Sequence, residues 1–242
     1  MSRAIELADV VVELDGEGRT AHLSLAVAAG EFLMLVGPNR SGKSLIVELC
    51  AGLVAPHQGT VRVLGKEWVG LSDEGRMKLR RRIGTVLQLP GLLSNMTVFN
   101  NVALPLRYHR SDLSEPEIQR VVMSQLEALG LAPLRDRFPA QLNPGEIRCA
   151  AIARSMVLDQ ELLLLDDPLA GLDAEMIHRL GAHLTNRRQG GPFTIVATMR
   201  SYSSFLNLAD RVAVLRGGQI EATGSRSTVA KQVGVDMSTY FG

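Results

Sequence analysis

An eight-residue loop near the N-terminus constrains this chain more than any other feature. Residues 37–44 read G-P-N-R-S-G-K-S and match the pattern G-x-x-x-x-G-K-[ST]. The apolar run Phe32–Val36 before the loop has the length of a strand buried on both faces, and residues 44–53 follow in helical register. A strand, a Gly-rich turn and a helix in this order create a concave surface of backbone N–H groups that attracts phosphate. This context favours a phosphate-binding loop over an ordinary Gly-rich turn.

The last two residues of the loop supply side-chain chemistry. Lys43 can reach the β- and γ-phosphate oxygens of a nucleotide, and the Ser44 hydroxyl can ligate Mg²⁺. The glycines let the backbone approach the phosphates closely. We therefore expect the whole loop to bind the cofactor, through Gly37, Pro38, Asn39, Arg40, Ser41, Gly42, Lys43 and Ser44.

A second signal lies at residues 162–167, where four leucines precede Asp166 and Asp167. A buried strand would deliver Asp166 at its carboxyl end, where ligands bind in open α/β sheets. Asp166 can then hold Mg²⁺, and Asp167 is next in line to position or activate water. The competing interpretation is a strand that ends in two solvated acids, but the phosphate-binding loop favours the metal site.

Strand and helix patterns alternate at both ends of the chain, with a mostly helical stretch at about residues 96–158 between them. Within that stretch, Ser114 caps a helix that Gly130 ends. Besides the segments above, the pattern predicts a turn at 15–18, a helix at 174–189, and strands at 5–12, 22–27, 60–64, 83–87, 193–198 and 211–215. The alternation predicts an α/β fold with a parallel sheet as its core.

Composition and charge exclude several classes of protein. The 242 residues carry 26 Lys+Arg and 25 Asp+Glu, and a net charge of +1 gives no electrostatic reason to expect nucleic acid as a partner. Cys50 and Cys149 are too few and too far apart in sequence for a disulfide framework or a Cys-based metal site. No apolar run approaches the ~20 residues that span a bilayer, and acids occupy positions where a signal peptide is apolar. We expect an intracellular protein, soluble by itself, that can dock on a membrane protein.

In this order, the motifs resemble those of the ATP-binding subunits of ABC transporters, over residues 5–223. The loop at 37–44 is similar to the Walker A motif of that family, and Asp166-Asp167-Pro168 looks like its Walker B motif. The resemblance implies the P-loop NTPase fold of ABC ATPases: α/β, with a RecA-like parallel sheet core, an antiparallel β subdomain and a helical insert. It also implies the cofactors ATP and Mg²⁺, and one nucleotide-binding domain over 1–242 with the helical subdomain inserted at about 90–158.

Three further motifs carry the resemblance. Gln88 stands where the family has its Q-loop glutamine, which senses Mg²⁺ and the transmembrane partner. Residues 142–146 (L-N-P-G-E) stand at the L-S-G-G-Q signature, and residues 170–173 look like the D-loop. The resemblance thus implies a catalytic set of Asp167, Gln88 and Lys43, and a metal-binding set of Ser44, Gln88 and Asp166.

Four positions depart from the pattern of the family. The aromatic residue that stacks on adenine falls near Leu14, so an aliphatic contact replaces the stack. The catalytic glutamate is Asp167, which is one methylene shorter. The H-loop histidine falls on Met199, and the signature Ser-Gly falls on Asn143-Pro144. We keep Leu14 and Met199 as nucleotide-contacting positions and expect a P-loop ATPase with slow or impaired hydrolysis.

The altered signature at residues 142–146 suits the start of a helix better than it suits a phosphate-binding site. Asn143 is a good N-cap, Pro144 suits the first helical position, and Glu146 completes a capping-box spacing. Pro144 has no N–H to donate to a phosphate. Asn143 and Gly145 remain as donors, and with Asp173 of the D-loop they complete the expected cofactor-binding residues.

One stretch narrows the resemblance further. Residues 96–107 look most like subunits of MCE-type (Mla-like) lipid transporters, and residues 127–131 are similar too. This predicts a subunit that drives lipid transport from the cytoplasmic face of the inner membrane. The expected partners are a transmembrane permease, a second copy of the chain and an MCE-type lipid-binding protein. The alternative is a non-hydrolysing, ATP-dependent scaffold or regulator of a membrane assembly, of the cell-division or lipoprotein-release type. An ABC protein acting on ribosomes or DNA is disfavoured, because those usually carry two cassettes or a long coiled-coil insertion.

Two features bear on the partners. The apolar stretch Leu89–Leu93 directly follows Gln88, and we expect it to contact the permease, although such leucines also pack cores. In ABC dimers each ATP lies between the Walker motifs of one chain and the signature of the other. This chain is altered in both, so an unaltered partner would leave both sites weakened. We therefore expect a symmetric homodimer with two equivalent sites, to which the tail through Tyr240-Phe241 contributes.

Overall fold

The computed structural model describes residues 2–14, 20–200 and 203–233. The predicted turn at 15–18 and the tail at 240–242 lie outside these ranges. In the part of the chain that is described, no helix is both long and apolar enough to cross a bilayer.

Two sheets form the framework, and the larger one confirms the predicted parallel core. Its order is β10–β9–β3–β8–β7–β6, and all neighbours pair in parallel except β9 and β10. These strands are β3 (Phe32–Val36), β6 (Ile83–Val86), β7 (Leu162–Leu165), β8 (Thr194–Met199), β9 (Arg211–Arg216) and β10 (Gln219–Gly224). The smaller sheet is antiparallel, in the order β2–β1–β4–β5, with β1 (Arg3–Glu13), β2 (Thr20–Ala28), β4 (Gln58–Val63) and β5 (Lys66–Glu67).

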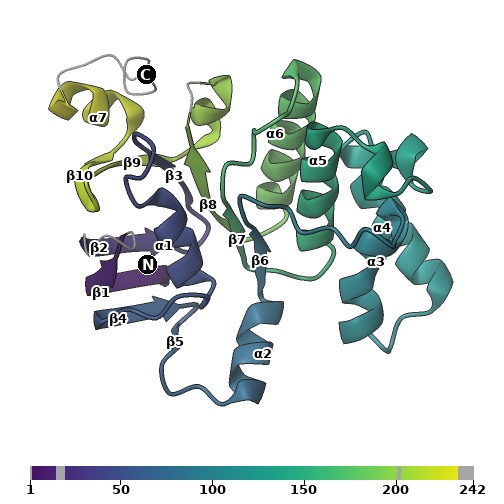
Figure 1. Ribbon diagram of the computed structural model, residues 1–242, viewed down its shortest axis with the longest axis horizontal. Helices are drawn as coiled ribbons and strands as arrows, with labels where there is room; N and C mark the ends of the chain where they lie inside the picture. The colour runs from purple at the N-terminus through teal and green to yellow at the C-terminus, as the bar shows by residue number, and fades with distance from the viewer. Residues whose placement is uncertain (1, 15–19, 201–202, 234–242) are drawn as a thin grey trace.

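The helices divide between the two sides of the large sheet. Figure 1 shows the teal helices α3, α4 and α5 gathered at the opposite end of the molecule from the purple strands β1 and β2. The helices are α1 (Lys43–Cys50), α2 (Asp73–Arg81), α3 (Val98–His109), α4 (Glu115–Ala128), α5 (Pro144–Ser155), α6 (Ala174–Gln189) and α7 (Arg226–Val233), and short 3₁₀ turns lie at Ala132–Leu134, Pro139–Gln141 and Ser204–Leu208. The insert of α3, α4 and α5 falls between β6 and β7, as the helical pattern predicted.

Two hydrophobic clusters cover the two faces of the large sheet. One joins that sheet to α3, α4, α5 and α6, and it contains the alternate β8 residues Ile195, Ala197 and Met199. The other holds α1 between the large sheet and the antiparallel sheet, and it contains Val196. Successive residues of β8 thus face opposite clusters, as the two-residue period of a strand requires.

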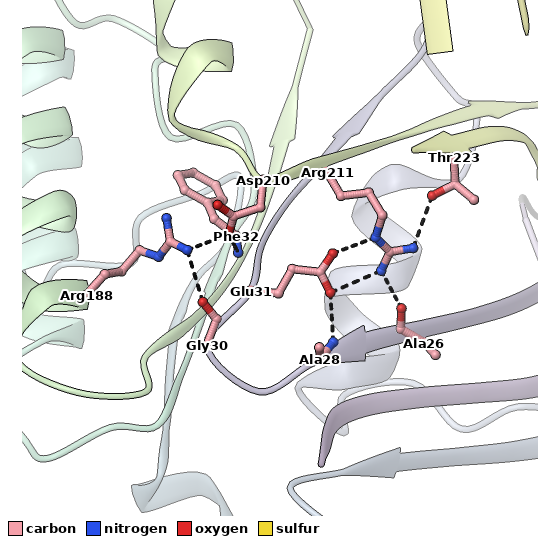
Figure 2. A network of polar contacts seen from close by, with 9 residues as sticks. All are labelled: Ala26, Ala28, Gly30, Glu31, Phe32, Arg188, Asp210, Arg211 and Thr223. Carbon is pink, nitrogen blue, oxygen red and sulfur yellow. Dashed lines mark hydrogen bonds and ion pairs between the residues drawn. The ribbon is translucent and has the colours of Figure 1, made fainter. Parts of the chain in front are cut away.

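Two arginine–carboxylate pairs fix the turn through which the antiparallel sheet enters β3 (Figure 2). Glu31 pairs with Arg211, whose guanidinium also donates to the β2 backbone. Asp210 pairs with Arg188 and accepts a hydrogen bond of 2.8 Å from the backbone N–H of Phe32. These contacts bind the first residue of β3 to β9 and α6, and so they fix the strand that leads into the phosphate-binding loop.

Candidate functional site

The loop at residues 37–44 winds closely against β9. Gly37 has a φ of +147°, and a Cβ atom there would lie 2.2 Å from the carbonyl oxygen of Leu215. Gly42, at φ +102°, is the N-cap of α1, and Arg40 also has a positive φ of 60°. Only glycine fits the approach at position 37, because the neighbouring atom is backbone and cannot rotate away.

Lys43 is folded into this loop. Its side-chain Nζ donates to the carbonyl oxygens of Gly37 and Pro38 at 2.6 and 2.7 Å, and to the hydroxyl of Ser41 at 3.3 Å. Burial lowers the pKa of Lys43, and the positive charge of Arg200 lowers it further. The ammonium of Lys43 is therefore hydrogen-bonded to loop carbonyls, and phosphate oxygens could accept these hydrogen bonds in their place.

A cleft of about 910 Å³ opens beside the loop and collects residues from separate segments. Most of the predicted loop lines it, together with Leu14, Gln88 and Asp166. Leu14 lies against Gly42, since a Cβ at that glycine would be 3.3 Å from its Cδ1. Glu48 also lines the cleft and was not predicted, although it lies one helical turn after Ser44 on the same face of α1.

Thr198 organises the two carboxylates that follow β7. Its hydroxyl donates to Oδ1 of Asp166 at 2.7 Å, and it accepts a 2.8 Å bond from the backbone N–H of Asp167. Asp166 is only 4% exposed, and Asp167 has a left-handed φ of 53°. The hydroxyl thus joins the side chain of Asp166 to the backbone of Asp167, a role that the sequence analysis missed.

Asp167 forms an ion pair with Arg200. The arginine Nε lies 2.9 Å from Oδ2 of Asp167, whose side chain is 13% exposed, against 41% for the arginine. Burial raises the pKa of Asp167, while the positive charges of Arg200 and Arg148 oppose that rise. The shortened carboxylate is therefore engaged by a cation in this structure, which no sequence motif indicated.

Met199 lies outside the cleft. It is 2% exposed and packs in the cluster with Ile195 and Ala197. The residues on either side of it, Thr198 and Arg200, line the cleft instead. The side chain of Met199 therefore does not line the cleft of its own chain, where the nucleotide contact was expected.

Arg148 of α5 is a second arginine that the sequence analysis missed. It is 6% exposed, and its guanidinium donates to the carbonyl oxygens of Leu87, Gln88 and Asp166 at 3.1, 2.9 and 3.4 Å. Burial lowers its pKa. This side chain ties the helix after the predicted signature to the backbone of Gln88 and of Asp166, the predicted metal ligand.

The signature residues stand apart from the cleft and form the helix start that the sequence predicted. The backbone N–H of Glu146 donates to Oδ1 of Asn143 at 2.9 Å, and its carboxylate accepts from the N–H of Asn143 at 2.8 Å. Gly145 packs on the D-loop, where a Cβ would lie 2.4 Å from the carbonyl oxygen of Gly171. Asp173 caps α6 by accepting from the N–H of Met176 at 2.8 Å. None of these lines the cleft of their own chain.

The cleft fits a nucleotide phosphate chain with Mg²⁺. The tight glycine loop, a buried lysine and a helix N-terminus together suit an anion. The predicted metal ligands Ser44, Gln88 and Asp166 all line the cleft, and they present one hydroxyl, one amide and one carboxylate. Among the residues that the structure describes, no group of three or more His, Cys, Asp or Glu could hold an ion by itself.

Residues 20–170 match the family model described as ABC transporter. The chain is 34% identical over 87% of its length to the sulfate/thiosulfate import ATP-binding protein CysA of Mesostigma viride, and 36% identical over 84% to the methionine import ATP-binding protein MetN 2 of Paraburkholderia xenovorans. It covers 59% and 52% of those relatives, so it spans little more than half of their length.

Solved structures show the same fold. The ATP-binding cassette MJ0796, a dimer in a post-hydrolysis state with ADP and Pi, superposes with a TM-score of 0.84 at 25% identity. The match covers 91% of this chain and 98% of that one. The fold predicted from the motifs is therefore confirmed, including the parallel core, the antiparallel sheet and the helices between β6 and β7.

Proposed function

Because this chain belongs to the family of ABC transporter ATP-binding domains, we propose that it is the ATP-binding subunit of a membrane transporter. The observation that carries the proposal is the cleft, which brings Lys43, Ser44, Gln88 and Asp166 together from three separate segments. In the proposed complex, Lys43 and the loop backbone hold the phosphates, and Ser44, Gln88 and Asp166 hold Mg²⁺. Bound Mg²⁺ neutralises phosphate charge, while the protein positions the terminal phosphate and water.

Nucleotide binding is tested by equilibrium titration with Mg²⁺·ATP. We expect Lys43→Ala to weaken binding at least tenfold, because a buried ammonium makes charge-assisted bonds to phosphate that a methyl group cannot make. Because Leu14 replaces an aromatic residue that would stack on adenine, the binding free energy of ATP should be weaker by on the order of 1 kcal/mol. The wild-type affinity should therefore be moderate. Equally weak binding by both proteins would sink the proposal.

Hydrolysis is proposed to be slow in the isolated chain. The carboxylate of Asp167 is about 1.5 Å shorter in reach than that of a glutamate, and misplacement of this size can cost ~10²-fold. It is also paired with Arg200, and Met199 offers no hydrogen bond. Asp167→Glu should therefore restore little turnover in a phosphate-release assay. Rapid turnover by the isolated wild-type chain would refute this assignment.

An apolar groove of about 610 Å³ supports the proposed permease contact. Leu89 lies in it and is 84% exposed, and the neighbouring Leu53, Met77 and Tyr108 are more than half exposed. Leu92, by contrast, packs against the core of the insert. Leu92 therefore belongs to the packing of the insert, and the permease contact is proposed for Leu89.

The test is a pair of charge substitutions. Leu89→Glu should abolish recruitment to membranes that contain the permease while leaving the melting temperature unchanged, because the side chain is exposed. Leu92→Glu is the matched control and should lower the melting temperature, because it buries a charge. Normal recruitment of a folded Leu89→Glu protein would contradict the proposed docking groove.

The cargo is a separate proposal. The relatives named above import sulfate, thiosulfate or methionine by their names, and the stretch at residues 96–107 supports lipid and an MCE-type partner for this chain. We propose lipid, and the cytoplasmic face of the inner membrane as the place of action. Reconstitution with the co-purified permease separates the classes: lipid-stimulated turnover supports the proposal, and stimulation by a small solute alone overturns it.

Pairing is proposed to be symmetric. Asp167 would weaken one site of a mixed dimer, and Asn143-Pro144 would weaken the other, so a heterodimer would gain no intact site. MJ0796 has been solved as a dimer, which supports the arrangement. Subunit stoichiometry in the purified membrane complex tests it, and one copy beside a different ATPase chain would overturn it.

The second candidate function is an ATP-dependent scaffold that binds ATP without hydrolysing it. The engagement of Asp167 by Arg200 favours it. Turnover measured with and without the permease separates the two, because a transporter subunit is expected to be stimulated by its permease and a scaffold is not.

A further inference from the structure

The order of strands places a cation between the two halves of the cleft. In the large sheet, β8 lies between β3 and β7. Arg200 directly follows β8, and so it stands between the phosphate-binding loop after β3 and the carboxylates after β7. It shares a face of β8 with Thr198, and both line the cleft with Lys43. A side chain in this place can turn to either side.

The present partner of Arg200 lies on the β7 side. Asp167 holds it at 2.9 Å, but the two partners are unequally buried, since the arginine is 41% exposed and the carboxylate 13%. The backbone of Asp167 is fixed by its left-handed turn and by the hydrogen bond that its N–H donates to the Thr198 hydroxyl. The arginine is thus the more exposed partner of the pair and lines the cleft, so a stronger anion in the cleft would compete for it.

We propose that Arg200 recognises the terminal phosphate of ATP in this chain, and that it leaves Asp167 for that phosphate when ATP binds. The inference rests on the proposed function, because it requires ATP in the cleft. A terminal phosphate carries more charge than a carboxylate and accepts both arms of a guanidinium. ADP lacks the γ-phosphate, which is the terminal phosphate of ATP, so Arg200 stays on Asp167 when ADP is bound. The same exchange frees Asp167 to face water only when ATP is present.

Competition between two anions for one arginine gives an unusual expectation. Removing the carboxylate should strengthen ATP binding, because Arg200 no longer has to break an ion pair. Removing Arg200 should weaken ATP binding and leave ADP binding intact. Once Arg200 is absent, removal of the carboxylate should have little further effect.

The experiment measures equilibrium affinities for Mg²⁺·ADP and for the Mg²⁺ complex of an ATP analogue with a non-hydrolysable β,γ-imido bond. Arg200→Gln should weaken analogue binding about tenfold and change ADP binding less than about twofold. Asp167→Asn should tighten analogue binding several-fold, and the double variant should match Arg200→Gln. Arg200→Lys keeps the charge and should retain part of the preference for the analogue, and it serves as the reporter if Arg200→Gln does not fold.

Arg62→Gln is the matched control, since Arg62 pairs with Glu67 on the antiparallel sheet and is 55% exposed. It should leave both affinities unchanged. Equal weakening of ADP and analogue by Arg200→Gln, or no gain from Asp167→Asn, would overturn the inference. If the wild-type chain binds neither nucleotide better than Lys43→Ala, the proposed function fails and takes this inference with it.

Discussion

Replacing Arg148 by methionine tests whether one buried side chain ties α5 to the nucleotide cleft. The change keeps most of the volume but removes two good hydrogen bonds, to the carbonyl oxygens of Leu87 at 3.1 Å and Gln88 at 2.9 Å, and a longer one to Asp166. Each good bond from a charged donor is worth about 1.5 kcal/mol, so the loss is about 3 kcal/mol. The buried Nε of Arg148 has no hydrogen-bond partner among the described residues. Removing this unsatisfied donor should return about 1 kcal/mol to the free energy of unfolding.

The net expectation is a loss of about 2 kcal/mol from the free energy of unfolding. For a chain of this size, that lowers the melting temperature by about 4–8 °C. Amide hydrogen exchange at residues 87–89 should rise about tenfold or more, because the carbonyls at 87 and 88 lose their donor. The melting temperature of Arg148→Lys should lie between those of the wild type and Arg148→Met, since an ammonium cannot reach all three carbonyls. Arg62→Met, at an exposed ion pair, is the control and should change stability by less than about 0.5 kcal/mol.

An unchanged or higher melting temperature for Arg148→Met would refute this reasoning. It would mean that the cost of burying the guanidinium cancels its bonds, as happens for some buried charges. Arg148 would then not hold the backbone at Gln88.

Three other changes test separate parts of the structure. Gly37→Ala places a Cβ 2.2 Å from a β9 carbonyl and should lower the melting temperature and abolish ATP binding, whereas Gly191→Ala, at a similar φ of 146° but with nothing within 4 Å, should cost only backbone strain. Asn143→Ala removes an N-cap and its capping box and should cost about 1 kcal/mol in thermal denaturation, while Asn143→Asp should cost little. Burial and Arg187 lower the pKa of His183, so its neutral form is favoured on folding, and the stability that this contributes is complete above the ordinary histidine pKa and is lost as the pH falls through it. His183→Gln should therefore lose less melting temperature between about pH 7.5 and about pH 5.5 than the wild type, and an equal loss would contradict the assignment.

The sequence predicted elements where the local pattern was strong. The leucines of β7 and the amphipathic helix α6 were predicted with the bounds that the structure shows. Strands β5 and β10 were missed, because both are short or mostly exposed edge strands without an apolar run. Their place is decided by pairing with β4 and β9, which a local pattern does not contain.

The same limit explains which site residues could be predicted. The loop residues and Asp166 are recognisable because their neighbours in sequence define them. Arg148 contacts Asp166, 18 residues away, and Gln88, 60 residues away, and Arg200 pairs with Asp167, 33 residues away, so only the folded chain reveals these contacts. The two-residue period of β8 was available from the sequence, and it indicates that Met199 and Arg200 face opposite sides.

The cap at the start of α5 determines what this chain can offer to a second copy. A helix start can bind a phosphate through its first free N–H groups. Here Pro144 has no N–H group, and the N–H of Glu146 donates to the side chain of Asn143. Gly145 is therefore the backbone donor that is left among the first three positions of the helix. The Asn143 Oδ1 that makes the cap is also committed, which leaves its amide nitrogen as the remaining side-chain donor. The bonds that stabilise the helix are thus made at the expense of the bonds that would hold a nucleotide across a dimer. ATP alone should therefore hold two copies of the chain together only weakly. The proposed permease, with two docking positions, would raise the local concentration of the copies enough to pair them.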